Sequence, residues 1–378
     1  MDRASRNLMT RLDSSEFEFV TGLDALSEQG ARFWAEAAVP SFFLSRTWFE
    51  CLLSAGLDAS DRIALGVLRS GGRVLALLPT RYNGRSDGLA REIHSLTGPY
   101  ACLYRPVLLA HAVGRGVARS LGRHLGHSIR PGAIVHFDAV DAAWPELEEF
   151  EAGLREAGFR TFRYQHFGNW WEPLARRSFE GYLAARKGSL REIVRRRGRA
   201  LKNLGARFEV HSTGDGVESA VASYELVYSR SWKEPEPFPR FHGVLIRSAA
   251  SEGLLRFGSC WLGDRPIAVQ LWIHWAGSAT VLKLAHDQEF DRLSPGSVLL
   301  AYMIEQAIRE DGVREIDFGR GDDAYKRDWA TQRRQRIGLI AANPRSLRGG
   351  FVLAKQVAGQ WFSSVKNARR SSGGGPLR

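Results

Sequence analysis

The stretch LKLAHDQEFDRLSPGS, residues 282–297, leads from an apolar strand into a long helix and decides how the fold is interpreted. Ser294 is a good helix N-cap, and Pro295 suits the first helical position, where its missing N–H costs nothing. Gly296 leaves the backbone open to close approach, and the free N–H groups of a helix start attract anions. The stretch therefore predicts a strand, a loop and a helix that can bind a negative group. An ordinary capped helix is the alternative.

A second polar segment follows a short strand further along the chain. It reads DFGRGDDAYKRDW over residues 317–329 and leaves the strand through two glycines into a cluster of Asp, Arg, Tyr and Lys. Polar groups at strand ends meet ligands in α/β folds. The segment therefore predicts a loop that faces a ligand, and the alternative is charge that is simply solvated in a turn.

Both segments lie in the second of two halves that show the same order of elements. Alternating apolar residues predict strands, and a 3.6-residue period predicts helices. In the first half we expect strands at 16–21, 63–69, 74–82, 134–139 and 159–164, and helices at 23–38, 115–125 and 147–157. In the second half we expect strands at 206–211, 254–262, 266–275, 279–285, 315–318 and 336–342, and helices at 190–204, 217–231, 241–252 and 295–310. The shared order suggests that one fold was duplicated.

Length and composition favour a globular protein of two domains. The chain has 378 residues, 44% of them hydrophobic, with 11 Trp and 20 Phe, which is more than one core usually organises. No apolar run approaches the ~18 residues of a membrane-spanning helix, and the first residues do not resemble a signal peptide, so we expect a cytoplasmic protein. Cys51, Cys102 and Cys260 are too far apart in sequence to suggest a zinc site or a disulfide framework.

Positive charge points to an anionic partner. The net charge is +12, and the helix expected at 190–204 carries the run RRRGR at 195–199. This helix suits coenzyme phosphate, a nucleotide-sugar, tRNA or anionic lipid, and a solvated face is the alternative. Apolar residues also share one helical face between 351 and 365, which suits peripheral contact with the inner membrane or docking on the protein's own surface.

Taken together, these motifs resemble a known family. HDQEFDRLSPGSVLL at 286–300 and IDFGRGDDAYKRDW at 316–329 resemble the acetyltransferase (GNAT) family that includes the bacterial CelD/BcsL proteins of cellulose biosynthesis, relatives of the Fem peptidyltransferases. SWK at 231–233 and GDRPIA at 263–268 look similar to that family as well. Trp48 after Ser45, and LLP at 77–79 before Tyr82, resemble its N-terminal copy, so the likeness covers most of residues 15–345.

The resemblance implies an α/β (α+β) fold, a tandem GNAT-like acyl-CoA N-acyltransferase with mixed sheets flanked by helices. It implies an N-terminal GNAT-like domain at 1–175 and a C-terminal GNAT-like domain with the transfer site at 185–345. A C-terminal helix and a disordered basic tail are expected at 346–378, because the last residues lack apolar side chains. The acyl thioester would lie between splayed strands, with its pyrophosphate near a helix start.

Carried onto this sequence, the resemblance implies three groups of site residues. Acyl-CoA, typically acetyl-CoA, is the expected co-substrate, and no metal is expected. The donor would be bound by Leu284, Ala285, Ser294, Gly296 and Ser297. Asp287 is the expected base or nucleophile orienter, with a loop-capping carboxylate as the alternative, and Tyr325 is the expected acid for the leaving thiolate. The acceptor would be bound by Trp232, Lys233, Arg320, Asp322, Lys326 and Trp329, while His286 is expected to be structural.

Three functional hypotheses follow. The first is an acyltransferase that moves an acyl group from acyl-CoA to an amine or hydroxyl of an envelope or exopolysaccharide precursor. The second is a Fem-like transferase that uses aminoacyl-tRNA and therefore also needs a basic surface. The third is a non-catalytic partner of a glycan synthase. Coenzyme A binding separates the first hypothesis from the others.

Overall fold

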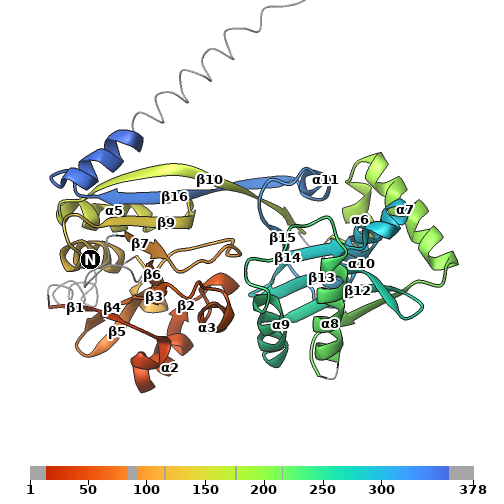
Figure 1. The fold of residues 1–378 in the computed structure, drawn as a ribbon, viewed down its shortest axis with the longest axis horizontal. Helices are drawn as coiled ribbons and strands as arrows, with labels where there is room; N and C mark the ends of the chain where they lie inside the picture. The colour runs from red at the N-terminus through yellow and green to blue at the C-terminus, as the bar shows by residue number, and fades with distance from the viewer. Residues whose placement is uncertain (1–13, 84–91, 115, 175–176, 215, 357–378) are drawn as a thin grey trace, which may run out of the picture.

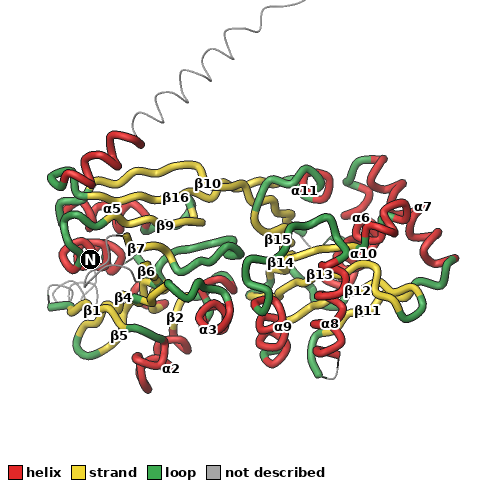
Figure 2. The backbone as a smooth tube through the Cα atoms, viewed as in Figure 1, coloured by secondary structure: helices red, strands yellow, loops and turns green. Residues whose placement is uncertain are grey.

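The computed structural model describes residues 14–83, 92–114, 116–174, 177–214 and 216–356. It consists of two α/β units that lie side by side and are joined by long strands (Figure 1). Figure 2 shows that the strands form the middle of each unit and that helices cover them. The predicted fold class, a tandem GNAT-like α/β arrangement with mixed sheets flanked by helices, is confirmed.

The first unit contains most of the chain up to residue 174. Its elements are β1 (Glu16–Val20), η1 (Leu23–Leu26), α2 (Ser27–Glu36), β2 (Ala37–Ala38), η2 (Phe42–Leu44), α3 (Arg46–Ala55), β3 (Asp61–Ile63), β4 (Leu65–Ser70), β5 (Arg73–Leu78), β6 (Thr80–Asn83), β7 (Glu92–Ser95), β8 (Val107–Leu109), η3 (Ala110–Ala112), α4 (Val117–Ser128), β9 (Ile134–Asp141), α5 (Leu147–Glu156) and β10 (Arg160–Pro173). The strand expected at 74–82 is split at Pro79, whose nitrogen cannot donate to a ladder.

The second unit follows the predicted order closely. Its elements are α6 (Phe179–Ala184), α7 (Gly188–Asn203), β11 (Arg207–His211), α8 (Gly216–Ser229), α9 (Phe241–Ser251), β12 (Leu255–Leu262), β13 (Arg265–Trp275), β14 (Ser278–His286), η4 (Gln288–Leu293), α10 (Pro295–Arg309), β15 (Glu315–Arg320), α11 (Lys326–Trp329) and β16 (Gln332–Ala342). Strands β11 to β14 form an antiparallel meander, and α10 then crosses over so that β15 runs parallel to β14. Helices α8 and α9 pack against this meander, as α10 does.

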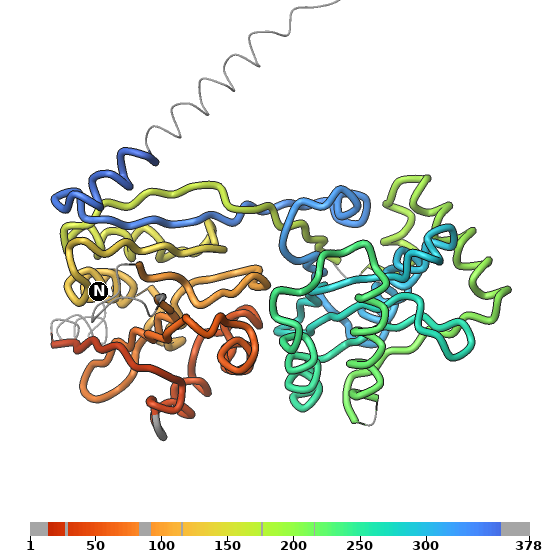
Figure 3. Tube along the Cα trace, in the orientation of Figure 1, coloured from red at the N-terminus to blue at the C-terminus, as the bar shows by residue number. Residues whose placement is uncertain are grey.

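Two strands connect the units into one sheet. The order β11-β12-β13-β14-β15-β10-β16-β9-β7-β6-β3 runs through both of them, and β1-β4-β5-β8-β2 forms a separate sheet in the first unit. Strand β16, which follows the second unit in sequence, lies between β10 and β9 of the first unit (Figure 3). Strand β10, expected only at 159–164, reaches Pro173 because its far end also pairs with β15.

The hydrophobic core is continuous across the contact between the units. Trp48 on α3 packs edge-on against Phe241 on α9, with ring centroids 5.6 Å apart. Tyr100, in the loop before β8, stacks on the same Phe241 ring at 4.6 Å. Aromatic burial of this kind contributes both area and geometry, so these rings hold the units in a defined relation.

Residues 347–356 form a helix next to the first unit. Phe351, which belongs to the expected membrane-contact face, is 72% exposed. Ala354 on the same face is exposed as well, while the part of the face beyond residue 356 and the expected disordered tail lie outside the described residues. Among the residues that the structure describes, no helix has the length and apolar character of a membrane span.

Candidate active site

Strands β14 and β15 separate after a short parallel ladder. Only Ser278 to Thr280 pair with Glu315 to Asp317 within the described sheet, although β14 continues to His286 and β15 to Arg320. Gly319 has φ +71° and approaches β14 so closely that a Cβ there would lie 2.6 Å from the Val281 carbonyl oxygen. Beyond this contact, residues 282–284 of β14 and Arg320 of β15 line a cleft.

The cleft consists of two adjoining cavities. The larger holds about 540 Å³ and is lined by the start of α10 together with residues around Tyr325. The smaller holds about 200 Å³ and reaches to the first unit. Four residues line both cavities, so the two spaces meet there; they are Lys233, Leu284, Asp323 and Tyr325.

The start of α10 opens on the larger cavity, as predicted. Ser294, Gly296 and Ser297 line it. The predicted side-chain cap is wrong in detail: Ser294 has a left-handed backbone (φ 48°, ψ 48°), and its side chain makes no capping hydrogen bond. Its carbonyl oxygen instead accepts from the amides of Ser297 and Val298. The positive end of the helix dipole still points at the cavity, which favours an anion there.

The two predicted donor residues on β14 are placed differently. Leu284 lines both cavities, whereas the next residue, Ala285, is buried in the core on the other face of the strand. This alternation is the period of two that any strand imposes. Leu284 therefore fits a role at the acyl or pantetheine part of a donor, and Ala285 does not touch the cleft.

Tyr325 and Trp329 both lie in the cleft. Tyr325 precedes α11, and Trp329 closes the larger cavity from the end of that helix. Burial and the nearby Asp323 carboxylate raise the pKa of the Tyr325 phenol above its ordinary value. The phenol is therefore protonated at neutral pH.

Asp287 has a structural environment. Its carboxylate accepts from Arg265 at 2.6 Å and from the amide of Glu289 at 3.1 Å, at the start of η4. Burial alone would raise the pKa of Asp287, but these hydrogen bonds hold it below its usual value. Asp287 is not among the residues that line either cavity. The geometry is that of the loop-capping carboxylate, the alternative to the predicted base.

Two of the predicted acceptor-binding residues are occupied by intramolecular contacts. Lys326 is buried, and its Nζ donates to the carbonyls of Arg320 (2.6 Å) and Gly321 (3.2 Å) and pairs with Asp323 (3.0 Å). Asp322 makes a two-pronged pair with Arg333, at 2.7 Å for each oxygen, and lies outside both cavities. Lys326 thus shapes the loop wall, and Asp322 ties the loop to β16.

The other predicted acceptor residues face the cleft. Arg320 lines the smaller cavity, Trp232 the larger and Lys233 both. His286, expected to be structural, contacts Trp232 with ring centroids 4.6 Å apart and lies 2.7 Å from Asp291. The second half of the chain thus brings these distant residues into one space.

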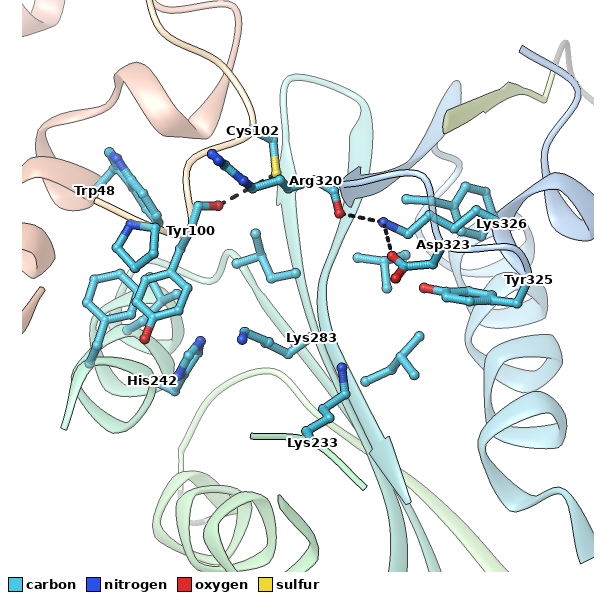
Figure 4. A pocket seen from close by; sticks show the side chains of 17 residues that line it. Trp48, Tyr100, Cys102, Lys233, His242, Lys283, Arg320, Asp323, Tyr325 and Lys326 are labelled. Atoms are coloured by element: carbon cyan, nitrogen blue, oxygen red, sulfur yellow. Dashed lines mark hydrogen bonds and ion pairs between the residues drawn. The ribbon is translucent and has the colours of Figure 1, made fainter. Parts of the chain in front are cut away.

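Several residues that line the cleft or contact its lining were not foreseen from the sequence. Glu236 accepts from Tyr100 Oη (2.9 Å), Tyr224 Oη (3.1 Å) and Lys283 Nζ (2.6 Å). His242 and Trp48 line the smaller cavity beside this cluster (Figure 4). No short sequence pattern links these residues, since they come from both units. Asp323 stood in the quoted loop, but nothing in the sequence distinguished it from Asp322.

Comparison with known proteins supports the fold. Residues 188–327 match the family model described as acetyltransferase (GNAT) domain. No curated protein matches the chain by sequence. No described group of three or more His, Cys, Asp or Glu side chains is arranged to hold a metal ion.

Solved structures resemble the chain over most of its length. FemX is 11% identical, with 90% of this chain and 100% of that one covered and a TM-score of 0.58. A conserved protein of unknown function from Bacteroides thetaiotaomicron is 12% identical, covering 86% and 99%, with a TM-score of 0.53. L-PGS from Bacillus licheniformis is 12% identical, covering 82% and 96%, with a TM-score of 0.50. At these identities the likeness concerns the fold alone. The chain therefore has a tandem GNAT-like α/β fold, and its residues 188–327 match the acetyltransferase (GNAT) domain.

Proposed function

We propose that the protein is an acyltransferase that moves an acyl group from acyl-CoA to an amine or hydroxyl, with the transfer site in the C-terminal domain, residues 185–345. The observation that carries the proposal is the separation of β14 from β15, which opens a cleft that ends at the start of α10. A helix start suits the pyrophosphate of the donor, and the open strand edge suits its amide-containing arm. Ser294, Gly296 and Ser297 would bind the anionic part, and Leu284 would contact the arm.

Two side chains at the junction of the cavities are placed to move protons. Asp323 lines both cavities, and its side chain is 61% exposed, so it can exchange protons with solvent. We assign it the role of base in place of Asp287. As the acceptor nitrogen or oxygen bonds to the acyl carbon, its proton passes to Asp323. The carbon–sulfur bond breaks, and Tyr325 gives its proton to the sulfur.

The acceptor is proposed to be a precursor of the envelope or of an exopolysaccharide. The motifs that resemble the CelD/BcsL family support this assignment, and so does the presence of polar and aromatic side chains around the acceptor end of the cleft. A cavity of about 200 Å³ limits the part of the acceptor that enters to a few heavy atoms around the nucleophile.

Coenzyme A binding tests the proposal directly. A ligand that binds only the native state raises the melting temperature by mass action. We expect acetyl-CoA and free coenzyme A to raise the melting temperature in a concentration-dependent way, and desulfo-coenzyme A to do the same, because it keeps the pyrophosphate. The absence of any shift with acetyl-CoA and longer acyl-CoAs, together with a shift by aminoacyl-tRNA, would overturn the acyl-CoA assignment.

A second candidate is transfer from aminoacyl-tRNA, which the position of α7 favours. Gly198 on α7 lies next to Val298 in the first turn of α10, so the basic helix flanks the end of the cleft. Arg191, Arg196 and Arg199 are exposed on it. Binding of tRNA through these side chains would weaken steeply with salt, and replacing Arg196 and Arg199 by Gln would reduce the slope of log K against log salt by roughly two.

A further inference from the structure

The smaller cavity is built by both units. Its walls include Trp48 and Tyr100 from the first unit and His242, Lys283 and Arg320 from the second. Figure 4 shows that the side chains of Lys233 and Lys283 extend into the space between Tyr100 and Tyr325. A donor bound along β14 toward α10 occupies the larger cavity, so this space is left for the acceptor.

Positive charge in this cavity exceeds the negative charge that contacts it. Lys283 pairs with Glu236 at 2.6 Å, and Lys326 pairs with Asp323 at 3.0 Å. Among the described residues, no carboxylate lies within ion-pair distance of Lys233 or Arg320. Two cations that line this cavity thus have no ion-pair partner among the described residues.

The surroundings of these two cations do not replace a counter-ion. Lys233 Nζ lies 5.4 Å from the centre of the Trp232 ring. Arg320 lies 4.3 Å above the Phe167 ring, is 3.1 Å from His166 Nε2 and donates to the Ala101 carbonyl at 3.5 Å. Burial and the charge of Lys283 lower the pKa of Lys233, and an anion bound beside Lys233 would offset that repulsion.

An unpartnered polar atom points to a ligand in the same cavity. His242 is 2% exposed, and its Nδ1 has no hydrogen-bond partner among the described residues. The nearest carboxylate oxygen, on Glu236, is 3.8 Å away, which is too far for a hydrogen bond. Burial lowers the pKa of His242 to about 3, so the ring is neutral and can donate or accept one bond to a polar ligand. Buried polar atoms without partners are uncommon in native proteins.

We propose that the smaller cavity is the acceptor subsite and that it takes acceptors that carry a carboxylate or phosphate close to the nucleophile, attracted by the cations Lys233 and Arg320 that line it. The proposal rests on the acyltransferase function, because that function defines which cavity is left for the acceptor. Glu236 holds Lys283 in the wall and acts as a positioning residue. A carboxylate and a phosphate both offer anionic oxygens to a cation, and the binding experiment below uses one probe of each kind to tell them apart.

Equilibrium binding tests the subsite without any turnover. The probes are two matched pairs of small amines, O-phosphoethanolamine with ethanolamine and glycine with glycinamide, titrated by calorimetry into the full-length protein. We expect at least one anionic probe to bind at least tenfold more tightly than its neutral partner. Arg320→Gln should remove most of this preference, and Arg320→Lys should retain part of it. Lys355→Met, an exposed lysine on the C-terminal helix, is the control and should retain it fully.

A second variant shows which cavity binds the anion. Ser297 lines only the larger cavity and Arg320 only the smaller. Ser297→Glu should weaken coenzyme A binding and leave the anion preference in place. If Ser297→Glu abolishes the preference and Arg320→Gln does not, the anion binds at the start of α10 and the proposal is wrong. Equal binding of charged and neutral probes also overturns it.

Turnover with acetyl-CoA separates this inference from the proposed function. If kcat/KM is higher for the anionic amines than for the neutral ones, and Arg320→Gln removes this difference, both the subsite and the acyltransferase function are supported. Turnover without preference overturns the inference and leaves the function standing. Selective binding of an anionic probe, with no turnover of any amine and no binding of coenzyme A, leaves an anion site in place and removes the function.

Discussion

Thr280 of β14 faces Asp317 of β15 in the last register pair before the two strands separate. The Asp317 carboxylate is fixed by three contacts. Asn169 on β10 donates to it at 2.6 Å, and Arg334 on β16 forms an ion pair with it. The amide of Gly319, on the same strand, donates to it at 2.8 Å. The point at which the cleft opens is therefore set by strands from both units.

Gly319→Ala should destabilise the protein because a Cβ there meets the Val281 carbonyl oxygen at 2.6 Å and the backbone has φ +71°. We expect a loss of ~2–5 kcal/mol in the free energy of unfolding, measured by urea denaturation. Gly263→Ala is the matched control, because Gly263 has φ +58° but open space around it. It should cost about 1–2 kcal/mol. Equal losses in both variants would show that the contact with β14 is unimportant.

Ser297→Glu should affect stability and donor binding in opposite directions. A carboxylate in the first turn of α10 interacts favourably with the helix dipole, by about 0.3–1 kcal/mol, so the unliganded protein should melt slightly higher. The same charge in the larger cavity should weaken coenzyme A binding at least tenfold. Ser297→Gln, similar in size and uncharged, should show neither effect. Tight coenzyme A binding by the Glu variant would place the phosphates elsewhere.

Tyr325→Phe should lower kcat by roughly 100-fold, the usual contribution of a positioned acid. KM for acyl-CoA should change much less, because the ring remains. Burial and Asp323 raise the pKa of Tyr325, so its proton is retained at and above neutral pH, and kcat of the wild-type protein should not fall between about pH 7 and 9 from loss of this proton. Steady-state pH profiles of the wild-type protein and the Phe variant check the assignment of Tyr325 as the acid. Full turnover by the Phe variant would rule that assignment out.

Asp323→Asn and Asp322→Asn form a matched pair of neighbouring substitutions. Asp323 lines both cavities, so its loss should reduce kcat/KM by ~100-fold or more if it accepts the proton. Asp322 pairs with Arg333 outside the cleft, so its replacement should change kcat/KM less than threefold. The two losses are compared by measuring initial rates at saturating acetyl-CoA over a range of acceptor concentrations. A larger loss in Asp322→Asn than in Asp323→Asn would assign the base to Asp322.

Asp287→Asn should affect stability rather than proton transfer. The folded-state pKa of Asp287 is depressed, so its ion pair stabilises the protein above the ordinary carboxyl range near pH 4 and is lost as the pH falls below it. We expect the variant to lose about 0.5–1 kcal/mol at pH 7, because the ion pair with Arg265 is lost while the Asn oxygen can still cap η4, and progressively less as the pH drops below 4. Urea unfolding at pH 7 and pH 3 measures this. Unchanged stability with a 100-fold loss of kcat would restore Asp287 as the base.

Local patterns predicted the elements of the second unit well. The period of two in 279–285 and Pro295 at the start of the next helix identified β14 and α10 almost to the residue. The family resemblance placed Ser297 and Tyr325 in one candidate site. Strand alternation and helix starts are local signals, because they depend on residues only a few positions apart.

The sequence by itself thus determined the fold class, most element positions, and the loop segments from which the cleft is made. Only the tertiary structure decided that β16 lies in the first unit's sheet, that Asp323 rather than Asp287 faces the cleft, and that Tyr100 and Glu236 meet at Lys283. The physical reason is that strand order and ion pairing depend on which distant groups become neighbours when the chain packs. The alternation of apolar and polar residues is the same whichever partner a strand finds.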